Sequence, residues 1–558
     1  MYIIFTNSNR GLILKLHTYE IDSKYKTSVA YFSMEFGIHQ GLKIYSGGLG
    51  FLSGSHMRSA YDLHQNIVGI GILWSFGYYD QGRQSDGSLK AEFIRKHHYF
   101  LQDLNIKIKV KIHSEDVYIK AWLLPPNIFG SAPLILLSTD IEENNFLART
   151  ITHKLYDANE ETRISQEIVL GIGGVKVLDA LGHKVDVYHM NEGHALPLVY
   201  ELYAQLRDMQ EVKKRVVFTT HTPEDAGNEK HNIDLLYKFG FFSGLSMEEV
   251  RQITMVRDDS FGLTIGALRA VKISNAVSKF HGEVANRMWK DCEGKSEIIY
   301  ITNAQNRRFW TDRVMLNAFD AHEDYELISR KKHLKRVLFD VVADQTGQMF
   351  DPEVLTIVWA RRFAEYKRPG LLKQDFERFK SLITRVDYPV QVIWAGKPYP
   401  FDTNAINSFN ELIDLSRQFN NMAVLIGYEL ELSRMMKKGS DVWLNTPRVS
   451  REASGTSGMS ASMNGSVHLS TSDGWHPEFA KDGINSFTIP PSGSLSIEQQ
   501  DYEDNKSLMD ILENKIIPLY YDEPKKWIKI VNNAMSDVIP AFDSGRMVHE
   551  YYTKMYDV

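Results

Sequence analysis

Short apolar runs alternate with stretches of helical period through most of the chain. This alternation is typical of βαβ units and predicts parallel sheets. In the first half, residues 185–190 and 216–220 are predicted to form buried strands, and each ends in polar residues. The predicted strands of the second half are residues 354–360, 390–395, 422–426 and 442–444. Each of these is followed by Gly, Arg, Lys or Asn, at the strand end where open α/β sheets bind ligands.

Two halves that each present a polar strand-end face predict two domains with a cleft between them. At 558 residues, the chain also exceeds the size at which a single core stops growing. We therefore expect an α/β protein with two Rossmann-like domains, residues 1–302 and 303–558. The acidic stretch 494–505 is predicted to be a solvated loop. The aromatic segment around Tyr551 is predicted to be a helix that packs back on the body.

Composition narrows the function classes. Hydrophobic residues make up 43% of the chain and charged residues 24%, as in an ordinary globular protein. Acidic residues outnumber basic ones by 70 to 64, which gives a net charge of −6 and argues against nucleic acid as a main partner. Cys292 is the only cysteine, so an intramolecular disulfide is excluded and a reducing compartment is expected.

Secretion and membrane insertion are not expected either. The apolar opening, residues 1–5, is too short for the hydrophobic region of a signal peptide. The sequence also has no apolar run long enough to span a bilayer. We expect the protein to work in the cytoplasm, without a membrane partner.

A glycine-rich turn lies near the start of the chain. Gly47, Gly48 and Gly50 precede residues 51–64, which have helical apolar spacing. Glycines let backbone N–H groups approach an anion closely, and the following helix adds its positive end. The turn is therefore a candidate phosphate site, although the same glycines serve equally well in a purely structural turn.

Polar residues also follow the two strands of the first half. Asn191 and His194 come after the first, and His221 after the second. A lone histidine at a strand end is more often a hydrogen-bonded structural residue than a functional one, and the spacing by itself leaves both readings open.

The strongest cationic cluster follows the first predicted strand of the second half. It contains Arg361, Arg362 and Lys367. Guanidinium forks and an ammonium group suit a phosphate or diphosphate held in a cleft, and the competing interpretation is a surface ion-pair network. Gly455 and Thr456, in a second glycine-containing turn, offer N–H groups and a hydroxyl to the same kind of anion. Metal-ligand spacings are absent from the sequence, so no metal is expected.

The run around this second turn, residues 451–465, resembles the motif E-A-S-G-T-x-x-M-K of α-glucan (glycogen/maltodextrin) phosphorylases. Further segments resemble the short bacterial and archaeal type of that family: residues 29–37, 46–50, 221–228 (H-T-P-x-x-A-G), 361–368 (R-R-F-x-x-Y-K-R), 427–431, 441–447 and 472–475. The resemblance runs from about residue 29 to residue 491. It implies a glycosyltransferase of GT-B architecture that commonly forms homodimers.

The resemblance also implies residue roles. The glycine turn contacts the transferred sugar and its phosphate, and the backbone carbonyl of His221 lies near the anomeric carbon. Asn303 and Glu452 bind sugar hydroxyls, and Asn191 and His194 are expected on the same side. Arg362 and Lys367 bind the reacting phosphate, and Arg361 lies towards a second phosphate, which in the family belongs to the cofactor.

One residue departs from the family pattern. The lysine that carries pyridoxal phosphate as an imine is Ser460 here, and a hydroxyl cannot form an imine. We expect no covalent pyridoxal phosphate. In the first of three interpretations, a nucleotide sugar or another phosphate-bearing donor fills the pocket, and the protein is a retaining hexosyltransferase acting on an α-glucan or smaller sugar. In the second, pyridoxal phosphate binds non-covalently and α-glucan phosphorolysis continues. In the third, the chain is an inactive glucan-binding or regulatory homologue.

Overall fold

Two large sheets organise the computed structural model, which describes residues 15–224, 227–493 and 495–558. In order, the first sheet contains β13 (Glu297–Tyr300), β12 (Ile273–Ala276), β9 (Val216–Thr219), β8 (Val187–Asn191), β1 (Val29–Phe32), β2 (Ile67–Ile72), β7 (Leu134–Ser138), β6 (Glu115–Leu124) and β5 (Gln102–Ile112). Its strands run parallel from β13 to β7, and β6 and β5 continue it antiparallel.

The second sheet is entirely parallel. Its strands, in order, are β16 (Met422–Leu425), β15 (Val390–Ala395), β14 (Leu355–Ala360), β17 (Val442–Asn445), β18 (Val467–Thr471) and β19 (Ser486–Ile489). This is the doubly wound order, which reverses direction between β14 and β17. The six strands predicted from the sequence are confirmed as β8, β9, β14, β15, β16 and β17, with bounds that differ by at most two residues.

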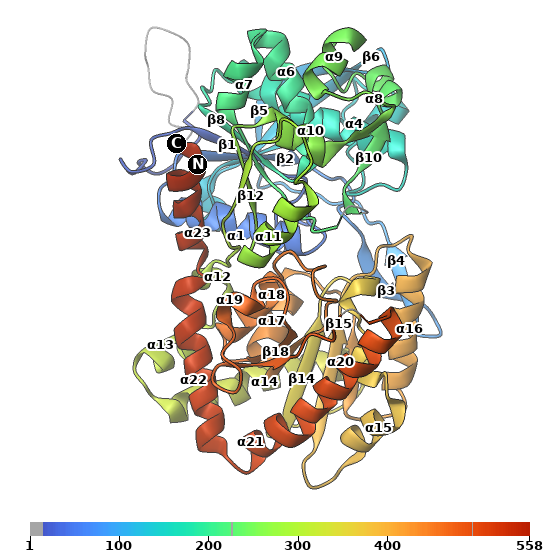
Figure 1. The fold of residues 1–558 in the computed structure, drawn as a ribbon, viewed down its shortest axis with the longest axis vertical. Helices are drawn as coiled ribbons and strands as arrows, with labels where there is room; N and C mark the ends of the chain where they lie inside the picture. Colours follow the sequence, from blue (N-terminus) through green and yellow to red (C-terminus); the bar gives the residue numbers. More distant parts are fainter. Residues whose placement is uncertain (1–14, 225–226, 494) are drawn as a thin grey trace.

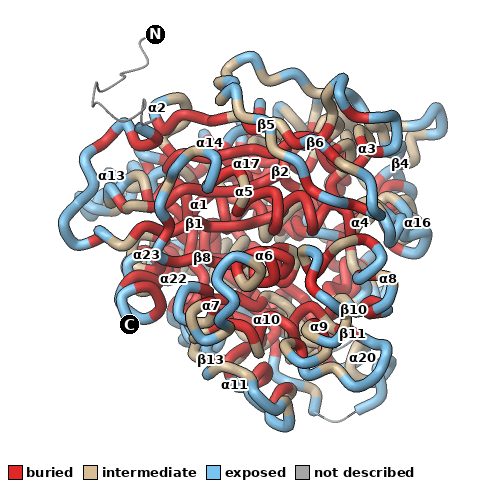
Figure 2. The backbone as a smooth tube through the Cα atoms, turned by 90° about the horizontal axis from the view of Figure 1, so that it is seen from above, coloured by how far each residue is buried: buried red, intermediate tan, exposed pale blue. Residues whose placement is uncertain are grey.

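Helices cover both sheets (Figure 1). The main helices of the first half are α1 (Gly48–Asp62), α4 (Glu160–Ile168), α5 (Gly174–Ala180), α6 (Pro197–Leu206), α10 (Leu263–Ala270) and α11 (Lys279–Met288). Those of the second half are α14 (Asp324–Thr346), α15 (Phe376–Thr384), α16 (Thr403–Ser416), α17 (Leu430–Gly439), α18 (Thr456–Ser462) and α20 (Ile497–Ile511). The central strands of both sheets lie in the buried interior, shown in red in Figure 2, because the helices shield their apolar faces from water, whereas the edge strands β5 and β13 are partly exposed.

The last helices connect the two halves. α22 (Pro524–Ala541) packs in the core of the second sheet, whereas α23 (Ser544–Tyr551) and the following π-helical turn, Tyr552–Tyr556, pack in the core of the first. Figure 1 shows them in red along one side of the molecule. The chain therefore returns to its N-terminal half after completing the second sheet. The proposed boundary between residues 302 and 303 stays a prediction.

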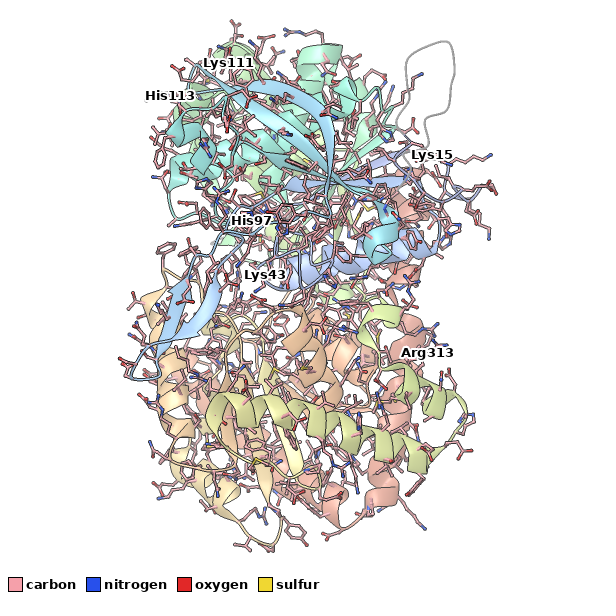
Figure 3. The ribbon with its side chains drawn as sticks, turned by 180° about the vertical axis from the view of Figure 1, so that it is seen from behind. Lys15, Lys43, His97, Lys111, His113 and Arg313 are labelled. Atoms are coloured by element: carbon pink, nitrogen blue, oxygen red, sulfur yellow. The ribbon has the colours of Figure 1, made fainter. Side chains whose placement is uncertain are left out.

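Side chains also join the halves directly. Lys43, labelled in Figure 3 where the upper and lower parts meet, pairs with Glu429 at 2.9 Å. The hairpin of β3 (Asp80–Arg83) and β4 (Leu89–Glu92) reaches the second half, where Gln81 donates to the carbonyl of Gly396 at 2.9 Å. These contacts hold the two strand-end faces next to each other.

The predicted loop at 494–505 is wrong over most of its length. Residue 494 lies outside the described residues, but α20 begins at Ile497, after a capping box between Ser496 and Gln499. Asp501 and Asp504 on this helix pair with the buried Arg368 at 3.0 and 2.7 Å. Two of the acidic residues therefore neutralise a buried arginine, whereas Glu498 and Glu503 on the same helix are exposed.

Two other sequence predictions concern the membrane and the N-terminus. Over the described ranges, none of the helices combines the length and the apolar character needed to cross a bilayer. The apolar opening, residues 1–5, lies outside the described residues.

Candidate active site

A cavity of about 620 Å³ lies between the two halves and contains most of the predicted site residues in its walls. These are Gly47, Gly48, His194, His221, Asn303, Arg361, Arg362, Lys367, Glu452, Gly455 and Thr456. Gly48 and Arg362 thus line one cavity from different halves. Gly50, Asn191 and Ser460 are not in the walls.

The topology explains why these segments meet. In the first sheet, the strand order reverses direction between β1 and β8, and in the second between β14 and β17. Crevices form at such points, beyond the carboxyl ends of the strands. Glu35 follows β1, Glu192 follows β8 and Arg361 follows β14, and all three line the cavity.

Glu35 fixes the glycine turn. Its carboxylate accepts hydrogen bonds from the backbone N–H groups of Ser46 and Gly47, at 2.6 and 3.3 Å, and from the Tyr156 hydroxyl at 2.7 Å. No local pattern in the sequence indicates this role, since Tyr156 is distant in the chain. Because the carboxylate holds the turn from one side, the other side is left to face the cavity.

The three predicted glycines divide into two kinds. A Cβ atom on Gly47 or Gly48 would meet no atom within 4 Å, whereas a Cβ on Gly50 would lie 2.5 Å from Cβ of Tyr45 and 2.8 Å from a carboxylate oxygen of Glu35. Gly50 is thus required by packing. Gly48 leaves open space at the start of α1, where a ligand can approach the backbone N–H groups.

We therefore expect Gly48→Ala to fold with a stability within about 1 kcal/mol of the parent, but to lower kcat/KM by roughly tenfold or more, since the methyl group enters ligand space. Gly50→Ala is the matched control and should lower the melting temperature instead. Thermal unfolding and steady-state kinetics measure both effects. Equal activity in the parent and Gly48→Ala would remove the glycine turn from the site.

The cationic segment after β14 is only partly neutralised. Glu452 accepts from Lys367 at 2.6 Å and from Arg361 at 3.3 Å. These neighbours outweigh burial and hold the pKa of Glu452 below its usual value. Arg362 is exposed and lines the cavity, and no carboxylate pairs with it within the described part of the chain. The cluster therefore has positive charge available for an anion.

Arg361 has unused donors. Its side chain is buried, and Nε and Nη1 have no hydrogen-bond partner among the described residues. Buried guanidinium N–H groups without an acceptor are unfavourable unless a ligand accepts from them. Thr456 also lines the cavity, at the start of α18. Because α18 has only seven residues, its dipole is small, and the anion site depends on the donors of Arg361 instead.

His221 is neutral and firmly held. Burial lowers the pKa of His221 to about 3, and its Nε2 lies 2.7 Å from the amide oxygen of Asn191, whose nitrogen donates to Ser33. Asn191 thus holds the His221 ring by a hydrogen bond and does not itself line the cavity. Residues 225 and 226 of the predicted H-T-P-x-x-A-G segment lie outside the described residues.

Glu192 holds the same loop through its backbone. Its carboxylate accepts from the His221 N–H at 2.8 Å, and burial raises the pKa of Glu192 to about 7. Glu192 itself has φ of +74°, a strained conformation for a residue with a side chain. This backbone conformation, which the sequence does not indicate, places the carboxylate within hydrogen-bond distance of the His221 N–H.

Two predicted sugar-side residues offer free polar atoms. The side-chain oxygen of Asn303 and Nδ1 of His194 are buried without a hydrogen-bond partner among the described residues, and both residues line the cavity. Burial lowers the pKa of His194 to about 4, so its imidazole is neutral. A neutral ring nitrogen and an amide oxygen suit sugar hydroxyl groups.

Ser460 provides no anchor for an aldehyde. It is fully buried inside α18, and its hydroxyl lies 3.2 Å from the carbonyl of Ser457, one turn earlier. Nearby, Lys437 is buried and lies over the ring of Trp310, with its ammonium nitrogen 3.6 Å from the centroid. Covalently bound pyridoxal phosphate therefore does not fit residue 460, whereas Arg361 remains suited to a phosphate group.

Comparison with known proteins identifies the family of the chain. Residues 277–490 match the carbohydrate phosphorylase family. The chain is 46% identical to the uncharacterized protein MJ1631 of Methanocaldococcus jannaschii, over 94% of this chain and 99% of the relative. It is 34% identical to maltodextrin phosphorylase of Thermococcus litoralis, over 96% of this chain and 71% of the relative. It is 32% identical to glycogen phosphorylase of Aquifex aeolicus, over 96% and 87%. The protein thus belongs to the carbohydrate phosphorylase family.

Proposed function

We propose that the protein is a retaining hexosyltransferase that moves a sugar between an α-glucan, or a smaller sugar acceptor, and a phosphate-bearing donor. Its two halves would act as Rossmann-like domains of a GT-B enzyme, in the cytoplasm, as a monomer or homodimer. The main support is the cavity itself, where the unpaired donors of Arg361 and the guanidinium group of Arg362 share one space with the free polar atoms of Asn303 and His194.

A nucleotide sugar is the donor that we favour. Arg361 and Arg362 are adjacent, and both line the cavity, so they suit two neighbouring phosphate groups better than one. In the transfer, the bond between the anomeric carbon and the phosphate oxygen breaks while the acceptor oxygen bonds to that carbon. The acceptor proton passes to the leaving phosphate. Arg362 stabilises the charge on that phosphate.

Phosphorolysis of α-1,4-glucan to glucose 1-phosphate is the second candidate. Its support is the name of the relatives that match nearly the whole chain, maltodextrin and glycogen phosphorylase. In that case inorganic phosphate would bind at Arg362, and pyridoxal phosphate, held without a covalent bond, would supply the phosphate beside Arg361. The inactive homologue is less consistent with the site, because an idle cavity has no use for buried, unpartnered guanidinium nitrogens.

One assay panel separates these functions. Purified protein is incubated with maltodextrin plus inorganic phosphate, with and without pyridoxal phosphate, and with maltodextrin plus a series of nucleoside diphosphate sugars. We expect turnover with a nucleotide sugar and release of nucleoside diphosphate. Glucose 1-phosphate formation that needs pyridoxal phosphate would favour the second candidate. If no combination supports turnover but the protein still binds glucan, the protein is an inactive glucan-binding homologue.

We also expect no imine with pyridoxal phosphate. Ser460 has no amine, and Lys397 in the cavity wall is held by Glu429 at 3.1 Å and by the carbonyl of Tyr79 at 2.8 Å. After incubation with pyridoxal phosphate and borohydride, peptide mass spectrometry should find no pyridoxyl group on cavity residues. An adduct on Lys397 would contradict this expectation and would favour phosphorolysis over the nucleotide-sugar reaction.

A further inference from the structure

A second cluster of polar side chains lies beside the sugar end of the cavity. It consists of Glu167 on α4, and Glu229 and His231 at β10 (Lys230–Asn232). One ligand atom from each residue lies within 4.8 Å of the other two. Glu167 and His231 are buried, and Glu229 lines the cavity. Glu229 and His231 are two positions apart, but Glu167 comes from a distant segment, so no local spacing in the sequence could indicate all three.

Glu167 has no direct hydrogen-bond partner among the described residues, although the charge of Arg163 acts on it from nearby. It is fully buried, and both carboxylate oxygens are without a hydrogen-bond donor among the described residues. Arg163, one helical turn earlier, is directed to Glu229 instead, with contacts of 2.6 and 3.3 Å. A buried carboxylate without a donor is strongly unfavourable unless a cation or a proton reaches it.

His231 is arranged as a metal ligand would be. Its Nδ1 lies 2.8 Å from the carboxylate of Glu160, whereas Nε2 has no hydrogen-bond partner among the described residues and lies 3.5 Å from Glu229. A carboxylate on one ring nitrogen commonly orients the other towards a metal. Two ligand atoms about 2.1 Å from one ion lie roughly 3.0–3.5 Å apart when they are neighbours, which matches the 3.5 Å between Nε2 of His231 and the Glu229 carboxylate.

We propose that Glu167, Glu229 and His231 bind one divalent cation, with Mn²⁺ as the best match. Two carboxylates and one imidazole combine the ligands preferred by Mn²⁺ with a nitrogen that Zn²⁺ also accepts. The remaining coordination positions belong to water. Bound there, the ion ties α4 to the strand that follows the His221 loop and fixes the wall of the cavity near His194. The inference does not depend on which donor the enzyme uses.

The test uses the full-length protein after dialysis against a chelator. Titration with Mn²⁺, followed by calorimetry and electron paramagnetic resonance, should show one bound ion per chain, and Zn²⁺ should compete with it. Glu167→Gln should weaken binding by a hundredfold or more, and Glu160→Gln by about 10- to 100-fold, because it removes the support of His231. Glu161→Gln, an exposed neighbour on the same helix, is the matched control and should bind as the parent does.

Thermal unfolding gives a second readout. Mn²⁺ should raise the melting temperature of the parent and of Glu161→Gln, but not that of Glu167→Gln. If Glu167→Gln does not fold, Glu160→Gln decides, since that carboxylate is half exposed. Absence of Mn²⁺ and Zn²⁺ binding to the parent, or unchanged binding in both Glu160→Gln and Glu167→Gln, would overturn the proposal. A carboxylic-acid infrared band lost in Glu167→Gln would then identify a proton as the partner.

Discussion

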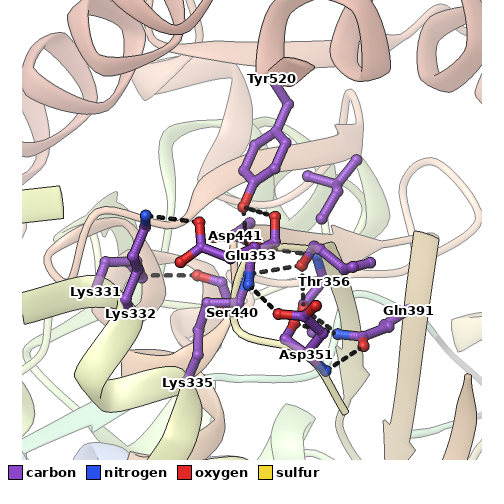
Figure 4. A network of polar contacts seen from close by, with 12 residues as sticks. Lys331, Lys332, Lys335, Asp351, Glu353, Thr356, Gln391, Ser440, Asp441 and Tyr520 are labelled. Atoms are coloured by element: carbon purple, nitrogen blue, oxygen red, sulfur yellow. Dashed lines mark hydrogen bonds and ion pairs between the residues drawn. The ribbon is translucent and has the colours of Figure 1, made fainter. Parts of the chain in front are cut away.

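A Lys335→Met variant is expected to unfold with a free energy about 3–5 kcal/mol lower than that of the parent, because it leaves a buried carboxylate unpaired. The side chains of Lys335 and Asp441 are 1% and 5% exposed. Figure 4 shows Lys335 among its partners in the second half, where it bonds to Asp441 and also donates to the carbonyl of Val354 at 2.7 Å. Asp441 in turn accepts from the N–H of Thr356 in β14 at 2.9 Å.

The controls separate charge burial from side-chain loss. Lys332, on the same helix, pairs with Glu353 at the surface, where the two side chains are 37% and 58% exposed. Lys332→Met should therefore change stability by less than about 1 kcal/mol. Adding Asp441→Asn to Lys335→Met removes the orphaned charge while keeping an acceptor for Thr356, and should recover part of the loss. Urea unfolding measures all three, and equal losses in the two single lysine variants would refute the argument.

This pair also shows what the sequence cannot indicate. Lys335 and Asp441 are 106 positions apart. The sequence contains many other lysines and aspartates, and no pattern in it singles out these two as a pair. Their burial follows from the packing of α14 against the second sheet, which becomes apparent once the fold is known. The same holds for Arg368, which continues the cationic segment in the sequence but pairs with Asp501 and Asp504 on α20. The predicted loop at 494–505 was wrong for this reason.

The predicted strands, in contrast, were recognisable because parallel strands covered on both faces need apolar residues throughout. All six residues of β15 are buried, and the sequence placed its bounds correctly. The site could be outlined for a related reason. Residues just beyond such strands must lie at the sheet edge, so Arg361 and His221 were placed in a crevice by the strands before them.

The supporting residues were less predictable. Glu35 holds the glycine turn and Glu192 holds the His221 loop, and both act through backbone N–H groups that any residue could supply. A sequence pattern contains no record of such bonds. For Ser460, in contrast, the sequence was sufficient, because a hydroxyl group cannot form an imine with pyridoxal phosphate. The structure adds that the side chain is buried and does not line the cavity.

Replacing Arg362 with alanine is expected to lower kcat/KM by a hundredfold or more, which corresponds to about 3 kcal/mol of transition-state stabilisation. Arg362 is exposed in the cavity wall and no described carboxylate pairs with it, so its charge is available to the leaving phosphate. For the same reason, the substitution should leave the melting temperature nearly unchanged.

Arg362→Lys tests the geometry of this interaction. It keeps the charge but loses the planar fork, so its activity should fall between that of Arg362→Ala and that of the parent. Arg368→Ala is the contrasting variant, since the buried ion pairs of Arg368 with Asp501 and Asp504 predict unfolding at lower temperature. Steady-state kinetics with the donor found in the assay panel, together with thermal unfolding, resolves the two effects. If Arg362→Ala retains activity within about threefold of the parent, the cationic segment does not carry the leaving group, and the proposed transfer would require a different phosphate site.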